Sequence, residues 1–150
     1  MTDEQLEKIA WLNRAFHAEK KVKALGSLLE RDKERAKDIS ANYEKNDKGR
    51  SDSRTNGIEE ILLLLAESEE KHAKALREYV CYRREIRKAL EKLHDDELEA
   101  LFTLRYLNYQ TMDEISVEMN YSISSVQRKH KSGIEKLIGN DIECPPLTVI

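Results

Sequence analysis

One apolar pattern constrains the fold of this chain more than any other feature. Between Ile58 and Leu93, positions that advance by alternating steps of three and four residues form a continuous series: Ile58, Leu62, Leu65, Glu69, His72, Leu76, Tyr79, Arg83, Ile86, Leu90 and Leu93. This spacing is typical of a helix that packs along another helix as in a coiled coil. The three polar members of the series, Glu69, His72 and Arg83, are expected to fix the register of the two helices.

A helix of similar length is predicted upstream. Thr2 and Gln5 have the spacing of a capping box, and apolar residues then recur at helical spacing as far as Ile39. We expect one unbroken helix that ends near Tyr43, a polar loop at about residues 46–57, and a second helix capped by Asn56. With 37% charged residues and only 5 Gly and 2 Pro, the composition favours long solvated helices. Residues 1–94 are therefore predicted to form a long antiparallel helical hairpin.

A second, smaller region is predicted at residues 95–139, followed by a tail at 140–150. Asp95 and Asp96 favour the start of a short helix, which the stretch "LNYQ" ends. Thr111 is expected to cap another helix, whose inward face carries Met112, Ile115 and Met119.

The chain is then expected to turn sharply at Asn120. After Gly, Asn most readily adopts the left-handed backbone conformation that a helix-turn-helix requires, and Ser122 can cap the helix that follows. In that last helix Val126, Ile134 and Leu137 are predicted to be buried, and Ile123 could lie on either side. The predicted fold class is all-α, a long antiparallel helical hairpin followed by a small C-terminal helix-turn-helix domain.

The last helix concentrates positive charge in a chain whose net charge is −3. Its cations are Arg128, Lys129, Lys131 and Lys136, whereas Glu135 is its only acidic residue between Ser122 and Ile138. Ser124, Ser125, Gln127, Arg128 and Lys131 are expected to face outward. Arg, Gln and Ser side chains can hydrogen-bond to base edges in the DNA major groove, and Lys side chains can neutralise phosphates. The alternative is that this basic end only complements the helix dipole and binds nothing.

The segment Gln110 to Leu137, "QTMDEISVEMNYSISSVQRKHKSGIEKL", resembles the last helix-turn-helix region of bacterial sigma factors. With "WLNRAF" near the start and a helical hairpin between, the whole layout is similar to small phage-encoded transcriptional regulators of the RinA and ArpU type. The resemblance implies a sequence-specific DNA-binding regulator of late phage genes. It also implies that Arg105 and Thr111 contact the DNA backbone, and that Ser124, Ser125 and Arg128 lie on the base-reading face.

The chain departs from the sigma pattern at two places. Where sigma factors have "RERVRQ", this chain has "ISSVQR", so the sigma preference for a promoter sequence does not carry over. Gly133 replaces an Ala inside the last helix, at a cost of up to about 1 kcal/mol, which predicts a loosely held helix end. No segment resembles the sigma region that melts promoter DNA.

Other functions are less well supported by the residues. A coiled-coil adaptor that binds RNA polymerase, or the small DNA-recognition subunit of a phage packaging terminase, would combine the same elements. No nucleophile motif, phosphate loop or metal-ligand spacing occurs, so we expect no enzyme, no cofactor and no metal. His17 and His130 are expected to be solvated or interfacial. The acidic start and the short apolar runs predict a cytoplasmic protein without a membrane span, which could associate with itself through the hairpin.

Overall fold

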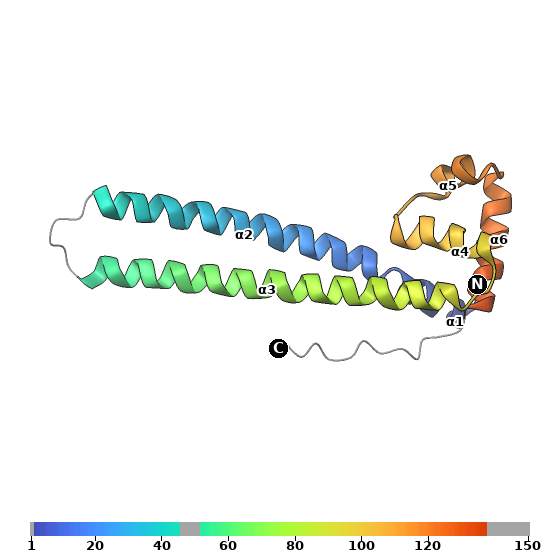
Figure 1. Ribbon diagram of the computed structural model, residues 1–150, viewed down its shortest axis with the longest axis horizontal. Coiled ribbons are helices and arrows are strands. Elements are labelled where there is room, and N and C mark those ends of the chain that lie inside the picture. Colours follow the sequence, from blue (N-terminus) through green and yellow to red (C-terminus); the bar gives the residue numbers. More distant parts are fainter. Residues whose placement is uncertain (1, 46–51, 138–150) are drawn as a thin grey trace. The chain divides into compact units, whose positions relative to one another are not determined.

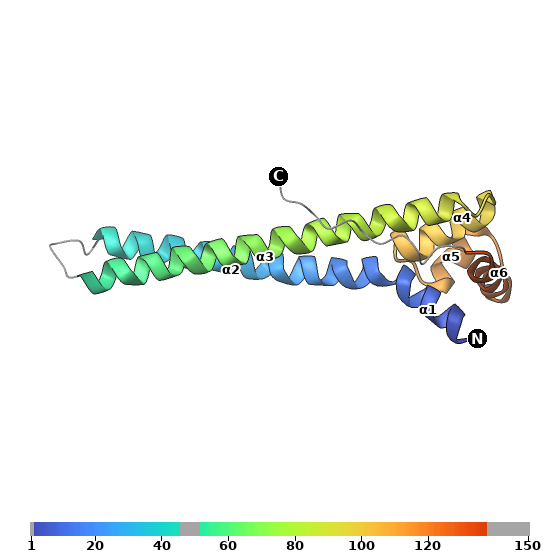
Figure 2. The ribbon, with the colours of Figure 1, turned by 90° about the horizontal axis from the view of Figure 1, so that it is seen from below.

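The structure is a computed structural model that describes the backbone of residues 2–45 and 52–137 and the side chains of residues 2–42 and 57–137. Its elements follow in this order (Figure 1): α1 (Asp3–Leu12), α2 (Arg14–Lys45), α3 (Asp52–Glu91), α4 (Asp96–Phe102), a π-helical turn η1 (Thr103–Leu107), α5 (Met112–Met119) and α6 (Ile123–Lys136). The described part of the chain is all-α, as predicted. The long helices α2 and α3 lie side by side and run in opposite directions as a hairpin (Figure 2), and small helices follow.

The fold divides into two compact units. One unit comprises Met1–Ala18 and Glu78–Ile150, and the other comprises Glu19–Arg77. The first unit therefore joins the C-terminal helices to α1 and to the end of α3. The second unit is the remainder of the hairpin.

The expected single N-terminal helix is interrupted at Asn13. Its start is as predicted, because Thr2 and Gln5 form a reciprocal capping box. After Leu12 the helix breaks, and the side chain of Arg14 donates to the carbonyl oxygen of Trp11 at 3.1 Å. Arg14 also pairs with the buried Glu85 at 2.5 Å, which draws the chain toward α3. The ion pair at this break joins residues that are 71 positions apart, so local sequence did not reveal it.

The second long helix starts earlier than expected. The predicted N-cap, Asn56, lies inside α3, which begins at Asp52. Each residue added to an existing helix fixes only its own backbone and gains one hydrogen bond. Polar residues can therefore extend a helix that apolar residues have nucleated. Residues 46–51 of the predicted loop lie outside the described residues, as do residues 138–150, which include the predicted tail at 140–150.

Within the hairpin unit, half of the six predicted seam positions on α3 are at least partly buried. Ile58, Leu65 and His72 are at least partly buried, as expected. The positions that alternate with them are Ile61, Ser68 and Ala75. They replace the predicted Leu62, Glu69 and Leu76, which are exposed. The prediction that Glu69 marks the register is therefore wrong.

Small and polar side chains explain this shift of the seam by one residue. Ser68 is 8% exposed and donates a hydrogen bond to the carboxylate of the buried Asp32 at 2.5 Å. One turn along, His72 faces Gly26 so closely that a Cβ on this glycine would lie 3.3 Å from His72 Nε2. Small side chains let the two helices approach, and the paired polar groups set their register.

The first unit contains the main hydrophobic core. Its buried members come from α1, the start of α2, the end of α3 and every C-terminal element: Leu12, Ala15, Ile86, Ala89, Leu90, Leu98, Leu101, Phe102, Tyr106, Leu107, Ile115, Val126, Ile134 and Leu137. Ile86 and Leu90 are buried as predicted. Arg83, expected on the hairpin seam, instead donates to the carbonyl oxygen of Leu107 at 2.8 Å and to the hydroxyl of Tyr109 at 3.1 Å. The end of α3 therefore holds the segment that leads into α5.

Candidate nucleic-acid interface

The turn between α5 and α6 has the predicted geometry. Asn120 closes α5 with φ 59° and ψ 41°, the left-handed conformation, and the next amide, of Tyr121, donates to the carbonyl oxygen of Ser116 at 3.0 Å. Thr111 caps α5 by accepting from the amide of Glu114, and Ser122 caps α6 by accepting from the amide of Ser125, each at 3.2 Å. The two helices and their turn form a helix-turn-helix.

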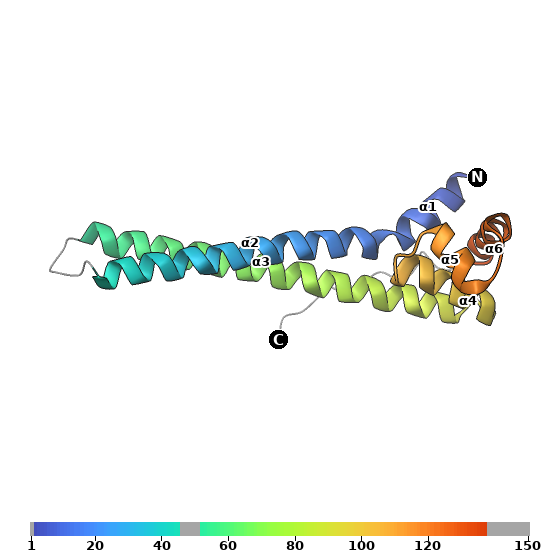
Figure 3. The same cartoon turned by 90° about the horizontal axis from the view of Figure 1, so that it is seen from above.

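Helix α6 is anchored along one face. Val126 and Ile134 are fully buried, and Leu137 is nearly so, as predicted. Both α1 and α4 pack against α6 (Figure 3), and the ammonium of Lys8 donates to the carbonyl oxygen of Ile134 at 3.2 Å. The C-terminal half of α6 is thus held from two sides.

Gly133 is part of this anchor, contrary to expectation. It is buried, and a Cβ at this position would collide with the ring of Phe102, with Cζ only 2.6 Å away. The glycine lets α6 approach the aromatic ring directly. The prediction of a loosely held helix end is therefore wrong, because the contact that compensates for glycine lies on another helix.

His130 was expected to be solvated or interfacial and is instead buried at 6% exposure. Its Nε2 shares a hydrogen bond of 2.5 Å with the hydroxyl of Tyr106, and its ring stacks on Phe102 with centroids 5.2 Å apart. Burial lowers the pKa of His130 to about 4 and raises the pKa of Tyr106 to about 12. Both groups are therefore uncharged at neutral pH, and His130 is an internal support of α6.

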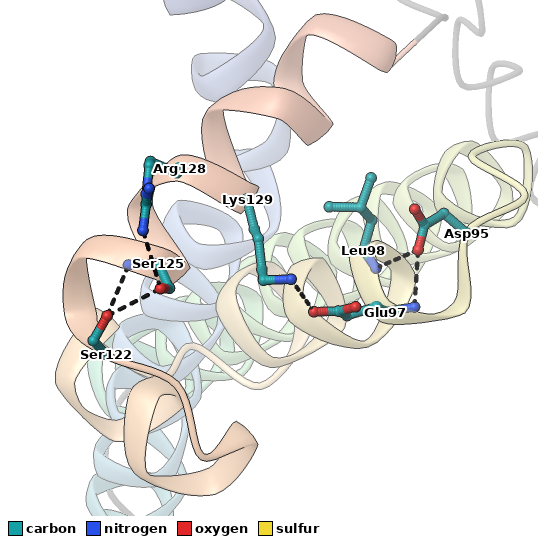
Figure 4. Close-up of polar contacts among 7 residues, drawn as sticks. All are labelled: Asp95, Glu97, Leu98, Ser122, Ser125, Arg128 and Lys129. Carbon is teal, nitrogen blue, oxygen red and sulfur yellow. Dashed lines mark hydrogen bonds and ion pairs between the residues drawn. The ribbon is translucent and has the colours of Figure 1, made fainter.

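The opposite face of α6 is open and polar. Ser124, Gln127, Arg128 and Lys131 are exposed as predicted, and Ser125 is half-buried. Ile123, for which both sides were possible, is 44% exposed. Ser122 donates to Ser125 Oγ at 3.0 Å, and Arg128 donates to the same oxygen at 3.3 Å. Figure 4 draws both contacts. This local network holds the Arg128 guanidinium beside the N-terminal turn of α6.

Lys129 differs from the other cations of α6. Its ammonium forms an ion pair with Glu97 at the start of α4 (Figure 4). The ammonium also lies 4.5 Å from the centre of the Tyr121 ring. The ion-paired hydrogen bond raises the pKa of Lys129 and lowers the pKa of Glu97. Glu97 is itself held at the N-terminus of α4, where Asp95 accepts from the amides of Glu97 and Leu98 at 3.1 Å. The charge of Lys129 is therefore largely compensated within the protein.

A shallow pocket of about 270 Å³ lies on this side of α6. It is lined by Ser125, Arg128, Lys129 and Ser132. The two hydroxyl groups and the guanidinium are donors that suit a phosphate oxyanion, whereas the Lys129 ammonium is already paired with Glu97. Sequence reasoning missed Ser132, although its spacing of seven residues from Ser125 places it on the same helix face.

The two residues proposed for backbone contacts outside α6 also have structural roles. Arg105 is half-buried and donates to the carbonyl oxygen of Gln110 at 3.0 Å, which stabilises the link into α5. The exposed Thr111 caps α5, and its hydroxyl also contacts Glu114 Oε1 at 3.2 Å.

Comparisons with protein-family models, with curated proteins and with solved structures return no match for this chain. Among the described residues, no three metal-ligating side chains gather into a site. Within the same residues, no helix has the length and apolar character needed to cross a bilayer.

Proposed function

We propose that this chain is a sequence-specific DNA-binding transcriptional regulator that inserts α6 into the major groove of double-stranded DNA. One observation carries the proposal. The left-handed turn at Asn120 leaves the N-terminal half of α6 with an exposed polar and basic face, while the opposite face is anchored in the core. A helix supported in this way can enter a groove without losing its own packing.

The exposed residues divide into two chemical groups. Ser124, Gln127 and Arg128 offer donors and acceptors that fit base edges, and Arg128 can bind guanine with two hydrogen bonds. Lys131 and the hydroxyl groups of Ser125 and Ser132, which line the pocket, suit phosphates of the DNA backbone. The remaining candidates position this interface through their contacts within the protein: Arg105, Thr111, Ser122 and Lys129.

The cellular role is proposed from the sequence resemblance. A phage or prophage regulator of late genes that acts in the host cytoplasm combines such a domain with a helical hairpin. Because this chain has "ISSVQR" where sigma factors have "RERVRQ", the operator is expected to differ from sigma promoters.

The decisive experiment is selection of bound fragments from the source genome by the purified full chain without RNA polymerase, followed by gel-shift measurements. We expect one or a few enriched sequences, bound more tightly than a scrambled duplex by at least about 1,000-fold. A triple variant Gln127→Ala, Arg128→Ala, Lys131→Ala should lose this preference. Lys88→Ala, at an exposed cation near the end of α3, serves as the control and should keep it. Fragments bound without any preference would refute sequence-specific recognition.

An adaptor that binds a protein such as RNA polymerase is the second candidate, and one observation favours it. Val117 on α5 is 77% exposed and lies among the exposed acidic residues Asp113, Glu114 and Glu118. This face repels phosphates and fits a basic protein surface better than DNA. If the chain shifts no DNA alone but does so when polymerase is added, the adaptor function replaces the first proposal.

A further inference from the structure

The hairpin unit contains a segment that is apolar on every side. In the run "ILLLLA", Ile61 and Leu65 are partly buried in the seam with α2. The three residues between them, Leu62, Leu63 and Leu64, are 54%, 62% and 51% exposed. Consecutive helical residues point about 100° apart, so these leucines span about 200° of the helix surface outside the seam.

Such an arc cannot be covered by α2 or by any single further helix. A surface helix usually presents one apolar stripe of roughly 100°, and a helix that is apolar all round is usually buried. Covering Leu62 to Leu64 therefore requires two additional helical neighbours. A second hairpin supplies two helices in one binding event, as in a four-helix bundle.

The charges around the leucines indicate which charge the hairpin that covers them should carry. Between Ile58 and Glu70, α3 has five acidic residues, all exposed, and no basic residue: Glu59, Glu60, Glu67, Glu69 and Glu70. The facing helix of the same unit has the opposite balance. Between Lys20 and Lys37, α2 carries seven basic residues against three acidic ones, of which Asp32 is buried.

The two charged surfaces also lie at the same level of the hairpin. The hydrogen bond between Asp32 and Ser68 places Arg31, Arg35 and Lys37 beside the acidic part of α3. All three cations are exposed. A second copy of this unit therefore has an apolar surface that can cover the leucines. At the same level it has a basic surface that can pair with the acidic residues of α3.

We propose that the chain forms a homodimer in which Leu62, Leu63 and Leu64 of each copy pack against the hairpin of the other, with α3 beside the partner's basic α2. The interface is isologous, because each copy presents the same apolar segment and the same pair of charged surfaces. For a DNA-binding chain, the dimer presents two recognition helices and calls for an operator with two half-sites. Only this last consequence rests on the proposed function.

The dimer is tested by the mass of the full chain in solution, measured by light scattering across a dilution series. The wild type should have twice the 17.5 kDa of one chain at micromolar concentration and dissociate on dilution. The double variant Leu62→Lys, Leu63→Lys should weaken the dimer at least about 100-fold and leave the helix content unchanged, because both side chains are exposed in one copy.

The control is Val117→Lys, which places the same charge at an exposed apolar position of the other unit. It should keep the mass of the wild type. If the double variant loses helix content, the single variant Leu63→Lys replaces it as the test. A wild type that is monomeric at about 100 μM, or a folded leucine variant that dimerises as tightly as the wild type, overturns the proposal. Because the readout is mass, failure here leaves the DNA-binding proposal intact.

Discussion

Gly133 of α6 packs directly on the aromatic ring of Phe102 at the end of α4, and no Cβ fits between them. Replacing Gly133 by Ala therefore forces the ring or the helix to move. We expect the free energy of unfolding to fall by about 1 to 3 kcal/mol, the usual cost of overpacking a core. Urea denaturation monitored by circular dichroism measures this loss.

Gly57 provides the matched control for that substitution. It also lies inside a helix, α3, but a Cβ added there meets no atom within 4 Å. Gly57→Ala should therefore raise stability, by about 0.5 to 1 kcal/mol, through helix propensity alone. If both variants change stability in the same direction, the contact with Phe102 does not explain the glycine.

The left-handed backbone at Asn120 predicts a second pair of variants. Asn120→Ala should lower stability by about 1 kcal/mol, because a Cβ without a polar side chain is disfavoured at positive φ. Asn120→Gly should be close to neutral, since glycine adopts this conformation readily. Thermal unfolding of the two variants beside Glu118→Ala, an exposed right-handed position on α5, separates backbone strain from side-chain loss. Equal effects of Ala and Gly at residue 120 would contradict the role of this conformation.

His130 predicts a loss of stability in mild acid. In the unfolded chain a histidine titrates near 6.5, whereas burial lowers the pKa of His130 to about 4 in the folded chain. Between these values the unfolded chain binds a proton that the folded chain does not, so stability falls as pH drops from about 6.5 to about 4. The loss attributable to this group is roughly 2 to 3 kcal/mol.

The measurement is the free energy of unfolding at several pH values for the wild type and for His130→Gln. The variant should be less stable at pH 7 and should lose less stability on acidification, so that the two curves converge. His17→Gln, at an exposed histidine, should follow the wild-type curve. Parallel curves for the wild type and His130→Gln would show that His130 does not titrate as its burial requires.

The exposed face of α6 predicts two different effects on DNA binding. Arg128→Ala should relax the preference for the selected operator and cost about 1 to 3 kcal/mol on that sequence only. Lys131→Ala should weaken binding to all duplexes and reduce the slope of log K against log salt by about one. Titrations of operator and scrambled duplex at several salt concentrations distinguish the effects. The same loss on every sequence in both variants would contradict this division.

The ion pair between Arg14 and Glu85 predicts a strong effect of removing one partner. The Glu85 side chain is 5% exposed, and the Arg14 guanidinium lies 4.8 Å from the centre of the Trp11 ring and 4.6 Å from that of Tyr82. Glu85→Ala leaves this cation without its counter-charge and should cost about 3 kcal/mol of stability. Glu97→Ala removes the partner of Lys129 at a more exposed site and should cost much less. The free energy of unfolding of both variants is measured by chemical denaturation. Equal losses in Glu85→Ala and Glu97→Ala would contradict a special role of the buried pair in holding α2 against α3.

The sequence by itself determined the features that depend on neighbouring residues. The caps at Thr2, Thr111 and Ser122, the left-handed turn at Asn120 and the all-α hairpin followed by small helices are as predicted. The caps and the turn are encoded within a few residues, by a side chain that binds a nearby amide or by a backbone preference. The hairpin is encoded by the periodic apolar pattern of two long segments. The outward face of α6 followed from helical spacing in the same way.

Only the tertiary structure decided which surfaces meet. The pattern on α3 placed Glu69 on the seam, whereas Ser68 occupies that position in the structure and donates a hydrogen bond to Asp32. The burial of His130 and the requirement for glycine at position 133 likewise depend on Phe102 and Tyr106, which belong to other elements. Periodicity locates a helix face to within about one residue, whereas the partner atoms that define its packing come from distant parts of the chain.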